Sequence, residues 1–471
     1  MKPYETALAL MFNTEAAHTM LRRCLDRHYK IDATPQQQAV IDFKDGRASV
    51  SACPGSGKTG TGVMHVRNVA TSWDAKTFHS YEMRDIFSRY VDFGFRHRPK
   101  MEMGGYFALM NEATGSNFKS WEDSPWDESL VNWAQNTTHT DHFDELQDDR
   151  DDTARTLADL RMYRAWAMKH CIMKFDDVLR IYAEPSNVRY LETHAVADHV
   201  FIDEFQDVNP FQFEVVVAMG RSVDTKSLVV VGDPNQSIYE WRGAKPGSFA
   251  EFNKEFHLDA SMPLTTNFRS KDEILQNAET ICNVGMTGVR GSDPESLRVD
   301  WDGSMDSLFR SDVHKDHAIL CRYNRDVVGW QLALTKENIP SHVIGGGTFW
   351  KSKHIKMALD RRKDGGGMQA LLNDPKWQRM LEGKSFRDNP DKVAEHEADA
   401  RWVIGMTKAD LETAQHCMQS PDGVRLSTIH KTKGAQFPEV LVHKGQDEKL
   451  LRETFVAYVA MTRAENYLTL G

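Results

Sequence analysis

The feature that most constrains this chain is the glycine-rich stretch 51-SACPGSGKT-59. It departs from the phosphate-loop pattern G-x-x-x-x-G-K-[ST] at one position, where Ala52 replaces the first glycine. Residues 48–52, which lead into the glycine turn, are small or β-branched and predict a buried strand. Residues 60–70, which follow the turn, can continue as a helix. A strand, a glycine turn and a helix direct backbone N–H groups at phosphate oxygens. The stretch therefore predicts an α/β domain that binds a nucleoside triphosphate.

The side chains of this loop have separate predicted tasks. Lys58 reaches the β and γ phosphates, and Thr59 is a ligand for Mg²⁺. Two glycines let the backbone approach the phosphates, although Pro54 removes one possible N–H donor. The predicted ATP-binding residues of the loop are Gly55, Ser56, Gly57, Lys58 and Thr59.

A second signal is the stretch 198-DHVFIDEFQDVNPFQ-212. The apolar run Val200–Ile202 predicts a buried strand, and Asp203 and Glu204 follow at its tip. Adjacent carboxylates at the end of a strand suit hydrolysis of a nucleotide bound with Mg²⁺. We expect Asp203 to hold the metal and Glu204 to take a proton from the attacking water.

A third signal is 227-SLVVVGDPNQSIYEWRGA-244, which begins with another buried strand. Gln236 lies just past the end of that strand, where ligands sit in open α/β sheets, and we expect it to sense the γ-phosphate. Tyr239, Trp241 and Arg242 follow at once, and aromatic rings beside an arginine stack on unpaired bases. The alternative is that Tyr239 and Trp241 belong to the core.

Composition limits the class of protein. A chain of 471 residues predicts two to four domains. The net charge of -10 gives no support to nucleic-acid binding, but an acidic protein can still carry a basic groove. The six cysteines form no C-x-x-C pair, so neither a zinc site nor a disulfide framework is indicated. With no apolar run long enough for a membrane span and no signal peptide, we expect a cytoplasmic or nucleoid-associated protein.

Together the blocks resemble superfamily 1 helicases of the UvrD/Rep/PcrA type. ACPGSGKT is similar to the A-x-x-G-x-G-K-T loop of that family, and DEFQD and GDPNQSIYEWRGA are close to its motifs. Further similar blocks follow the family order along most of the chain: 34-TPQQQAV-40, 77-TFHS-80, 175-FDD-177, 264-LTTNFRS-270, 345-GGGTFW-350, 427-STIHKTKGAQF-437 and 457-AYVAMTRAENYLTL-470.

The resemblance implies an α/β fold with two RecA-like parallel-sheet P-loop domains that carry helical insertions, and ATP with Mg²⁺ between them. It divides the chain into an N-terminal helical extension and four further parts. The predicted boundaries are 1–30 for the extension, 31–90 and 171–262 for the first RecA-like domain, 91–170 for its inserted helical subdomain, 263–350 and 424–471 for the second RecA-like domain, and 351–423 for a reduced second insertion.

The resemblance also implies the remaining nucleotide contacts. Gln37 reads adenine, with Gln36 as the alternative, and Phe268 stacks on the base. Gln436 takes the place of the family's glutamate at the ribose, and Arg269 is an arginine finger. The predicted catalytic residues are Lys58, Glu204, Gln236, Arg269 and Arg463, the second finger.

The resemblance places single-stranded DNA across both RecA-like domains. For Phe349 and His430 a packing role remains the alternative. The predicted DNA contacts are Phe78, His79, Tyr239, Trp241 and Arg242 on the first domain, and Phe349, Thr428 and His430 on the second.

The chain departs from the family pattern in three places. Only 17 residues separate Thr59 from Thr77, where the family has an additional strand and a DNA-contacting motif. Either that unit is missing, or 77-TFHSYEMRDIF-87 merges two motifs. Residues 13–30 read as an added amphipathic helix, and residues 351–423 as a reduced helical hairpin.

The function implied by the resemblance is that of an ATP-dependent DNA helicase or translocase that moves 3′ to 5′ on single-stranded DNA. The alternative is a DNA-stimulated ATPase that remodels or displaces a DNA-bound protein without efficient unwinding, because the second insertion is small. Expected partners are single-stranded DNA, junctions of single- and double-stranded DNA, and a replication or repair protein. We expect no membrane partner, and a monomer fits the sequence.

Overall fold

The computed structural model describes residues 5–12, 14–103, 105–121, 124–137, 139, 143, 151–240, 243–258, 261–299, 301, 314–346, 349–382, 390–417, 419–445 and 449–471. The chain forms two compact units, Met1–Leu264 and Thr265–Gly471, and each is described by itself. Within the ranges given, no helix has both the length and the apolar character needed to cross a bilayer.

Unit 1 is built on a parallel sheet that has six strands among the described residues, in the order β3-β1-β6-β7-β2-β8. Parallel pairing of neighbours puts all the carboxyl ends at one edge of the sheet. The strands are β1 (Thr6–Met11), β2 (Gly46–Ala52), β3 (Ser72–Thr77), β6 (His199–Ile202), β7 (Ser227–Gly232) and β8 (Met262–Leu264).

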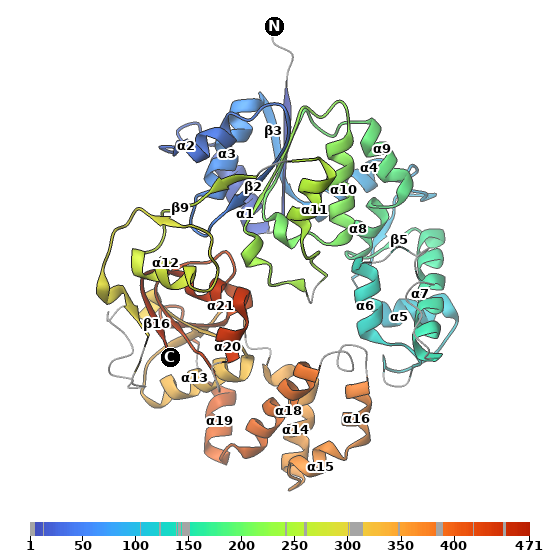
Figure 1. The fold of residues 1–471 in the computed structure, drawn as a ribbon. Helices are drawn as coiled ribbons and strands as arrows, with labels where there is room; N and C mark the ends of the chain where they lie inside the picture. Colours follow the sequence, from blue (N-terminus) through green and yellow to red (C-terminus); the bar gives the residue numbers. More distant parts are fainter. Residues whose placement is uncertain are drawn as a thin grey trace. The chain divides into compact units, whose positions relative to one another are not determined.

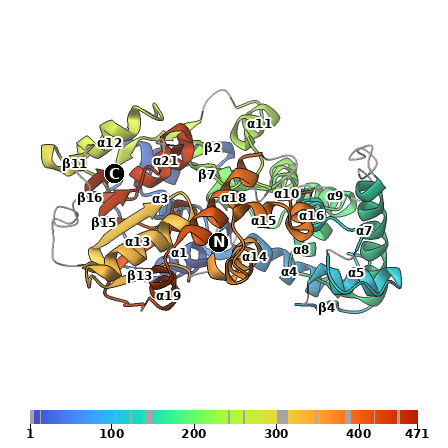
Figure 2. The same ribbon diagram turned by 90° about the horizontal axis from the view of Figure 1, so that it is seen from below.

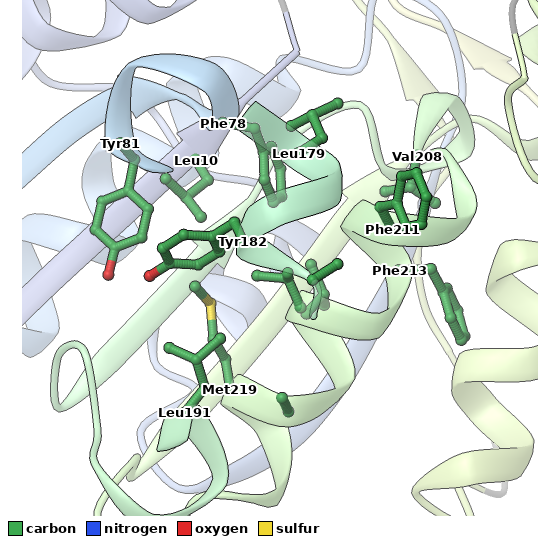
Figure 3. Close-up of a cluster of buried hydrophobic side chains, with 14 of the residues drawn as sticks. Leu10, Phe78, Tyr81, Leu179, Tyr182, Leu191, Val208, Phe211, Phe213 and Met219 are labelled. Atoms are coloured by element: carbon green, nitrogen blue, oxygen red, sulfur yellow. The ribbon is translucent and has the colours of Figure 1, made fainter. Parts of the chain in front are cut away.

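Alternating side chains of these strands enter two hydrophobic clusters, one on each face of the sheet. Leu8 and Leu10 of β1 pack in the cluster that contains Phe78, whereas Ala9 and Met11 pack in the other. Figure 3 shows Leu10 and Phe78 in the first of these clusters. Burial on both faces explains why the strands read as nearly continuous apolar runs in the sequence.

Helices cover both faces of the sheet of unit 1. In Figure 1, α2 and α3 lie on one side of the strands, and α4, α8, α9, α10 and α11 lie on the other. The predicted strand–turn–helix around the glycine loop is confirmed, since β2 ends at Ala52 and α3 begins at Lys58. The helices are α1 (Thr14–Leu25), α2 (Pro35–Ile41), α3 (Lys58–Val69), α4 (Phe78–Ser88), α8 (Asp177–Tyr182), α9 (Pro185–Thr193), α10 (Pro210–Arg221) and α11 (Ser248–Glu255).

The start of the chain differs from the prediction of a helical extension over residues 1–30. Thr14–Leu25 is indeed a helix, but Thr6–Met11 is β1, a strand between β3 and β6. The connection from α3 to the TFHS block supplies one strand, β3, so the strand that lies beside β6 comes from the beginning of the chain. The short apolar run TALALM pairs with partners about 65 and 190 residues away, which no local pattern reveals.

The first insertion is a helical module with its own core. Its helices α5 (Tyr106–Thr114) and α7 (Asp151–His170) pack side by side in both views of the molecule (Figures 1 and 2), and α6 (Glu128–Thr137) joins them. Trp126 lies in this core and donates its indole N–H to Asp159 over 2.8 Å. A two-stranded ladder, β4 (Lys100–Met101) with β5 (Ile172–Met173), closes the base of the module.

Unit 2 contains a second parallel sheet, with six strands among the described residues in the order β11-β16-β15-β12-β14-β13. Two such sheets with helices around them confirm the predicted α/β fold class. The strands are β11 (Leu297–Arg298), β12 (His317–Cys321), β13 (Ser341–Val343), β14 (Val424–Thr428), β15 (Phe437–Val442) and β16 (Ala464–Leu470), and the helices that accompany them are α12 (Asp272–Glu279), α13 (Asn324–Lys336), α20 (Lys449–Arg452) and α21 (Thr454–Met461).

The second insertion is more than the hairpin predicted from the sequence. Its described helices α14 and α18 pack on each other around a core that includes Trp377 and Ala400. Three basic residues end α14, and one of them, Arg361, pairs there with Asp374. The helices are α14 (Lys353–Lys363), α15 (Met368–Leu372), α16 (Pro375–Glu382), α18 (Pro390–Gly405) and α19 (Lys408–His416).

One buried carboxylate in unit 1 is expected to lower stability. Glu82 on α4 is fully buried, and neither carboxylate oxygen has a hydrogen-bond partner. Burial raises the pKa of Glu82 well above its ordinary value of 4.5. We expect Glu82→Met to raise the free energy of unfolding at pH 7 by about 1–3 kcal/mol, because an unsatisfied polar group is removed.

The pH dependence of this effect follows from the direction of the shift. A carboxyl with a raised pKa binds its proton more tightly in the folded state, so wild-type stability falls as pH rises above 4.5. Denaturant melts at several pH values should therefore show a small advantage of Glu82→Met at acid pH that grows toward neutrality. An advantage that is constant with pH would mean that Glu82 is not the titrating group.

Candidate nucleotide-binding site

The glycine loop between β2 and α3 has the backbone conformation that close approach to an anion requires. Gly55 and Gly57 both have left-handed φ angles, 67° and 76°. A Cβ on Gly57 would also lie 2.9 Å from the Gln37 side chain. Gly57 immediately precedes α3, so the unpaired N–H groups of the first turn face the loop. Ala52 is the last residue of β2 and needs no glycine conformation.

The predicted charges meet at the carboxyl ends of β2 and β6, which are separated in the sheet by β7. Lys58 Nζ lies 4.0 Å from Glu204 Oε2. Asp203, which is almost fully buried, accepts a hydrogen bond from the Thr59 hydroxyl. Burial first, and then the Glu204 carboxylate, raise the pKa of Asp203 to about 7. The structure therefore brings together the predicted phosphate lysine, both predicted metal ligands and the predicted base.

Glu204 sits in a strained backbone conformation. Its φ and ψ angles are 54° and 42°, in the left-handed region that residues other than glycine seldom adopt. This conformation starts the turn η3 (Phe205–Asp207), and the Glu204 N–H donates to Asp203 Oδ1 over 2.9 Å. The tight turn keeps both carboxylates at the end of β6.

A chain of hydrogen bonds connects Glu204 to the end of β7. Gln206 donates to Glu204 Oε2 over 2.6 Å and accepts from the Asp233 N–H over 3.0 Å. Gln236, which was predicted to sense the γ-phosphate, donates to Asp233 Oδ2 over 2.8 Å. A Cβ at Gly232 would lie 2.1 Å from Gln206 Oε1, so the chain of bonds needs a glycine there. Gln206 and Asp233 are site residues that sequence reasoning did not select, because only the sheet order makes β6 and β7 neighbours.

We expect Gln206→Ala to lower kcat for ATP by about 10–100-fold, the usual cost of losing an outer partner of a catalytic carboxylate. The physical reason is that the Glu204 side chain loses its link to the end of β7. The control is Gln212→Ala, which removes a buried glutamine from the N-terminal cap of α10. We expect the ATPase rate to fall in Gln206→Ala and not in Gln212→Ala. Equal losses in both variants would assign Gln206 a purely structural role.

Gln37 does not have the free side chain that reading adenine requires. It is buried, donates to the Ser56 carbonyl over 3.0 Å and accepts from the Thr34 N–H over 2.9 Å. These bonds close the capping box of α2 and hold the glycine loop. The structure therefore gives Gln37 a bracing position behind the loop, and the alternative residue Gln36 is more exposed.

In unit 2, the LTTNFRS block presents an aromatic ring and an arginine on a fixed turn. The buried Asn267 at the end of β9 (Thr266–Asn267) accepts from the N–H groups of Arg269 and Ser270, each over 2.8 Å. Ser270 in turn donates to the Ala464 carbonyl over 2.6 Å. Phe268 is 41% exposed on this turn, as a residue that stacks on a base must be.

Arg463 lies in a different setting from Arg269. Arg463 is 1% exposed, and its guanidinium donates to the carbonyls of Val459 and Ala435 over 3.0 and 3.1 Å. These contacts join the end of α21 to the segment before β15. In this structure Arg463 braces unit 2, and a finger role would require its guanidinium to exchange these acceptors for phosphate oxygens.

Gln436 holds Arg269 in place. Arg269 Nε donates to Gln436 Oε1 over 3.0 Å at an exposed position, and its Nη1 donates to the Thr462 carbonyl over 2.9 Å. A neutral amide orients the guanidinium without cancelling its charge. We expect Gln436→Glu to lower ATP turnover by up to about fivefold, since an exposed ion pair worth roughly 0.2–1 kcal/mol would compete with phosphate. Turnover that is unchanged in low salt would mean that Arg269 does not meet phosphate.

The first two predicted DNA contacts differ in burial, since Phe78 is a core residue and His79 is half-buried. Phe78 is 1% exposed and belongs to the core drawn in Figure 3, so a direct contact with a base is not open to it. His79 stacks on Phe175, with ring centroids 4.1 Å apart, and burial lowers the pKa of His79 to about 4. Phe175 is 51% exposed. Sequence reasoning quoted the FDD block but did not select this exposed ring as a candidate contact.

The other predicted DNA contacts differ in how far they are exposed. Tyr239 is partly exposed, whereas Trp241 and Arg242 lie outside the described residues. Phe349 is buried against Trp350 and Trp402, which supports the packing alternative. Thr428, at the end of β14, is also buried, and His430 of η10 (Ile429–Thr432) is partly exposed.

The residues of unit 1 fit a nucleotide carried with a divalent cation. The negative charge of Glu204 makes ionisation of Asp203 less favourable, and a bound divalent cation would offset this repulsion. Among the described residues there is no cluster of three or more His, Cys, Asp or Glu that would suit a metal alone. Mg²⁺ in nucleotide sites takes few protein ligands and several from water and phosphate, so Thr59 and Asp203 suffice.

A glycine loop at the end of one parallel strand, with an acidic pair at the end of another, defines the class of P-loop nucleotide-binding domains. Residues 65–257 match the sequence model of the UvrD/REP helicase N-terminal domain. The resemblance to UvrD/Rep/PcrA-like superfamily 1 helicases, drawn above from the motifs, is thereby confirmed.

Similar proteins carry helicase names. The chain is 30% identical over 223 residues to a probable DNA helicase II homolog of Mycoplasma capricolum, covering 42% of this chain and 30% of that protein. It is 28% identical to the ATP-dependent DNA helicase SRS2 of Saccharomyces cerevisiae, over 43% of this chain and 19% of the relative. It is 26% identical to the ATP-dependent DNA helicase Rep of Escherichia coli, over 38% of this chain and 30% of the relative. The alignments thus span less than a third of each of these relatives.

Proposed function

We propose that this protein is an ATP-dependent DNA helicase or translocase that moves along single-stranded DNA, 3′ to 5′. The observation that carries the proposal is the meeting of Lys58, Thr59, Asp203 and Glu204 at the carboxyl ends of two strands of unit 1. The names of the similar proteins, which are DNA helicases, support DNA as the substrate on which the energy of ATP hydrolysis is used.

The residues of unit 1 have defined tasks in ATP hydrolysis under this proposal. The backbone N–H groups of the glycine loop and Lys58 bind the phosphates, and Thr59 with Asp203 holds Mg²⁺. Bound Mg²⁺ supplies positive charge that offsets the charge on the phosphate oxygens. Glu204, oriented by Gln206, accepts a proton from the attacking water, and Gln236 lies at the far end of the same hydrogen-bond chain.

In unit 2, Phe268 stacks on adenine, Arg269 stabilises charge on the transferred phosphoryl group, and Gln436 orients Arg269. For the nucleic acid, Phe175 on His79 is the favoured stacking surface of unit 1, and the partly exposed Tyr239 is a further candidate. Base stacking on aromatic rings is worth about 1–3 kcal/mol per base and tolerates any sequence, as stepping along a strand requires.

The deciding experiment measures ATPase with and without single-stranded DNA, together with unwinding of duplexes that bear a 3′ or a 5′ tail. We expect ATPase stimulated by single-stranded DNA and strand separation only on the 3′-tailed duplex. Stimulated ATPase with no strand separation on either tail would favour the alternative, a DNA-stimulated ATPase that displaces bound protein. We retain this alternative because the second insertion, residues 351–423, is small.

Two fluorescence measurements extend the test to the nucleic-acid surface. Binding of labelled oligo(dT) and of a 3′-tailed duplex would compare single strands with junctions, both of which are expected partners. Phe175→Ala should weaken oligo(dT) binding by about 1–3 kcal/mol, or roughly 5–150-fold, whereas unchanged binding would remove Phe175 from the proposed path.

A further inference from the structure

The strand β1 lies between the two parts of unit 1 that the proposed function assigns to ATP and to nucleic acid. On one side it pairs with β6, whose tip carries Asp203 and Glu204. On the other side it pairs with β3, which leads into α4 and His79. Since α3 and β3 are joined by only Ala70 and Thr71, the connection after the glycine loop supplies no strand for this place.

At its carboxyl end, β1 holds the backbone of the predicted metal ligand. The N–H of Asp203 donates to the Leu10 carbonyl over 3.0 Å, one residue beyond the last paired position of β6. Leu10 itself is fully buried. A displacement of Asp203 on binding a cation would therefore be transmitted directly to the end of β1.

Two residues further, the same segment contacts the helix that carries His79. The rings of Phe12 and Phe78 have centroids 4.9 Å apart and planes inclined by 33°. Phe78 is the first residue of α4, and His79, the next residue, stacks on Phe175. The three residues Leu10–Phe12 thus connect the carboxylate at β6 with the aromatic pair at the start of α4.

The segment that follows α1 is fixed to the phosphate-loop helix. Arg67 of α3 donates to the carbonyls of Asp26 and Tyr29 over 3.1 and 3.0 Å. Gly60 of α3 is approached so closely that a Cβ there would lie 2.6 Å from the Tyr29 hydroxyl. The start of β1 is held as well, because the Glu5 carbonyl accepts from the Thr71 N–H over 3.0 Å. The segment Glu5–Tyr29 is therefore an integral part of the nucleotide-binding unit.

We propose that β1 couples the nucleotide site to the nucleic-acid surface, with Phe12 as the positioning residue that links Leu10 and Asp203 to Phe78 and His79. The proposal rests on the proposed function, in which the His79–Phe175 pair contacts nucleic acid. Occupation of the metal site shifts the end of β1, and the Phe12–Phe78 contact carries this shift to the first turn of α4.

The test measures a coupling factor between two ligands of the full chain. Affinity for fluorescent oligo(dT) is measured with and without Mg²⁺ and a non-hydrolysable ATP analogue, for wild type, Phe12→Ala and Phe12→Tyr. Couplings of this kind are typically about 5–150-fold. We expect the factor of Phe12→Ala to fall to within about twofold of one, and Phe12→Tyr, which keeps the ring, to retain the wild-type factor.

The matched control is Phe43→Ala, which removes a partly buried ring from the cluster on the other face of the sheet. A loss of coupling in Phe43→Ala equal to that in Phe12→Ala, or an unchanged factor in Phe12→Ala, would overturn the proposal. If Phe12→Ala does not fold by circular dichroism, Phe12→Leu keeps the bulk without the aromatic face and carries the same expectation.

Failure of the proposed function has a different signature from failure of the coupling. A wild-type protein that binds the ATP analogue and has no measurable affinity for oligo(dT) would overturn the proposed function itself. A wild-type protein that binds both ligands, with a factor that Phe12→Ala leaves in place, would overturn the role of Phe12 alone.

Discussion

Lys58→Ala is expected to lower ATP hydrolysis by on the order of 10²–10³-fold, because it removes a fixed positive charge that faces the phosphates. Lys58 begins α3, and its ammonium group lies 4.0 Å from the Glu204 carboxylate. Under the proposed function, Lys58 binds the phosphates from this position beside the acidic pair. The measurement is steady-state ATPase at saturating Mg²⁺–ATP, with thermal melting to show that the variant is folded.

The control for Lys58→Ala is Lys44→Ala, which removes an exposed lysine ahead of β2 and should leave ATPase unchanged. Lys58→Arg adds a second comparison, because a planar guanidinium does not reproduce the compact ammonium. ATPase that survives Lys58→Ala would refute the assignment of the nucleotide site, whatever the behaviour of the other variants.

Arg269→Ala is expected to lower kcat by about 10³-fold or more, the usual effect of removing an arginine that stabilises charge on the transferred phosphoryl group. The structure supports this role with a partly exposed side chain on a rigid turn next to the exposed ring of Phe268. Turnover is measured at saturating Mg²⁺–ATP and single-stranded DNA, so that the change is in kcat rather than in KM.

The comparison with Arg463→Ala distinguishes a finger from a brace. Because the buried Arg463 guanidinium donates to the carbonyls of Val459 and Ala435, its removal loses both hydrogen bonds and should lower the melting temperature. A loss of turnover near 10³-fold in folded Arg463→Ala would support the second finger. A loss of tenfold or less, together with lower stability, would leave Arg463 as a brace and Arg269 as the proposed finger.

The local structure predicted around the nucleotide site is the one that the structure shows. The loop from Ala52 to Thr59 and the pair Asp203–Glu204 are local signals, each made by one strand and the turn that follows it. Such local signals can be recognised in the sequence without knowing the order of the strands in the sheet. The roles of these residues in catalysis remain predictions, which the variants above test.

Predictions that depended on burial were less reliable. Phe78 resembles a DNA contact by its motif, but it lies in the core between β1 and α4. Gln37 was expected to read adenine, but its side chain is used by the glycine loop and by its own helix cap. Aromatic and amide side chains serve in cores as well as at surfaces, and their neighbours in the sequence do not distinguish the two.

The sequence by itself determined which residues lie at the strand ends and the helix N-terminus of the candidate nucleotide site, since a strand, a tight turn and a helix N-terminus place those side chains locally. Only the tertiary structure decided the neighbours of β6. It placed Thr6–Met11 beside β6 although Ile202 is about 190 residues away, and it joined Glu204 to Asp233 through Gln206. The physical reason is that strand order is set by long-range burial of both faces of a parallel sheet, which leaves no local periodicity to read.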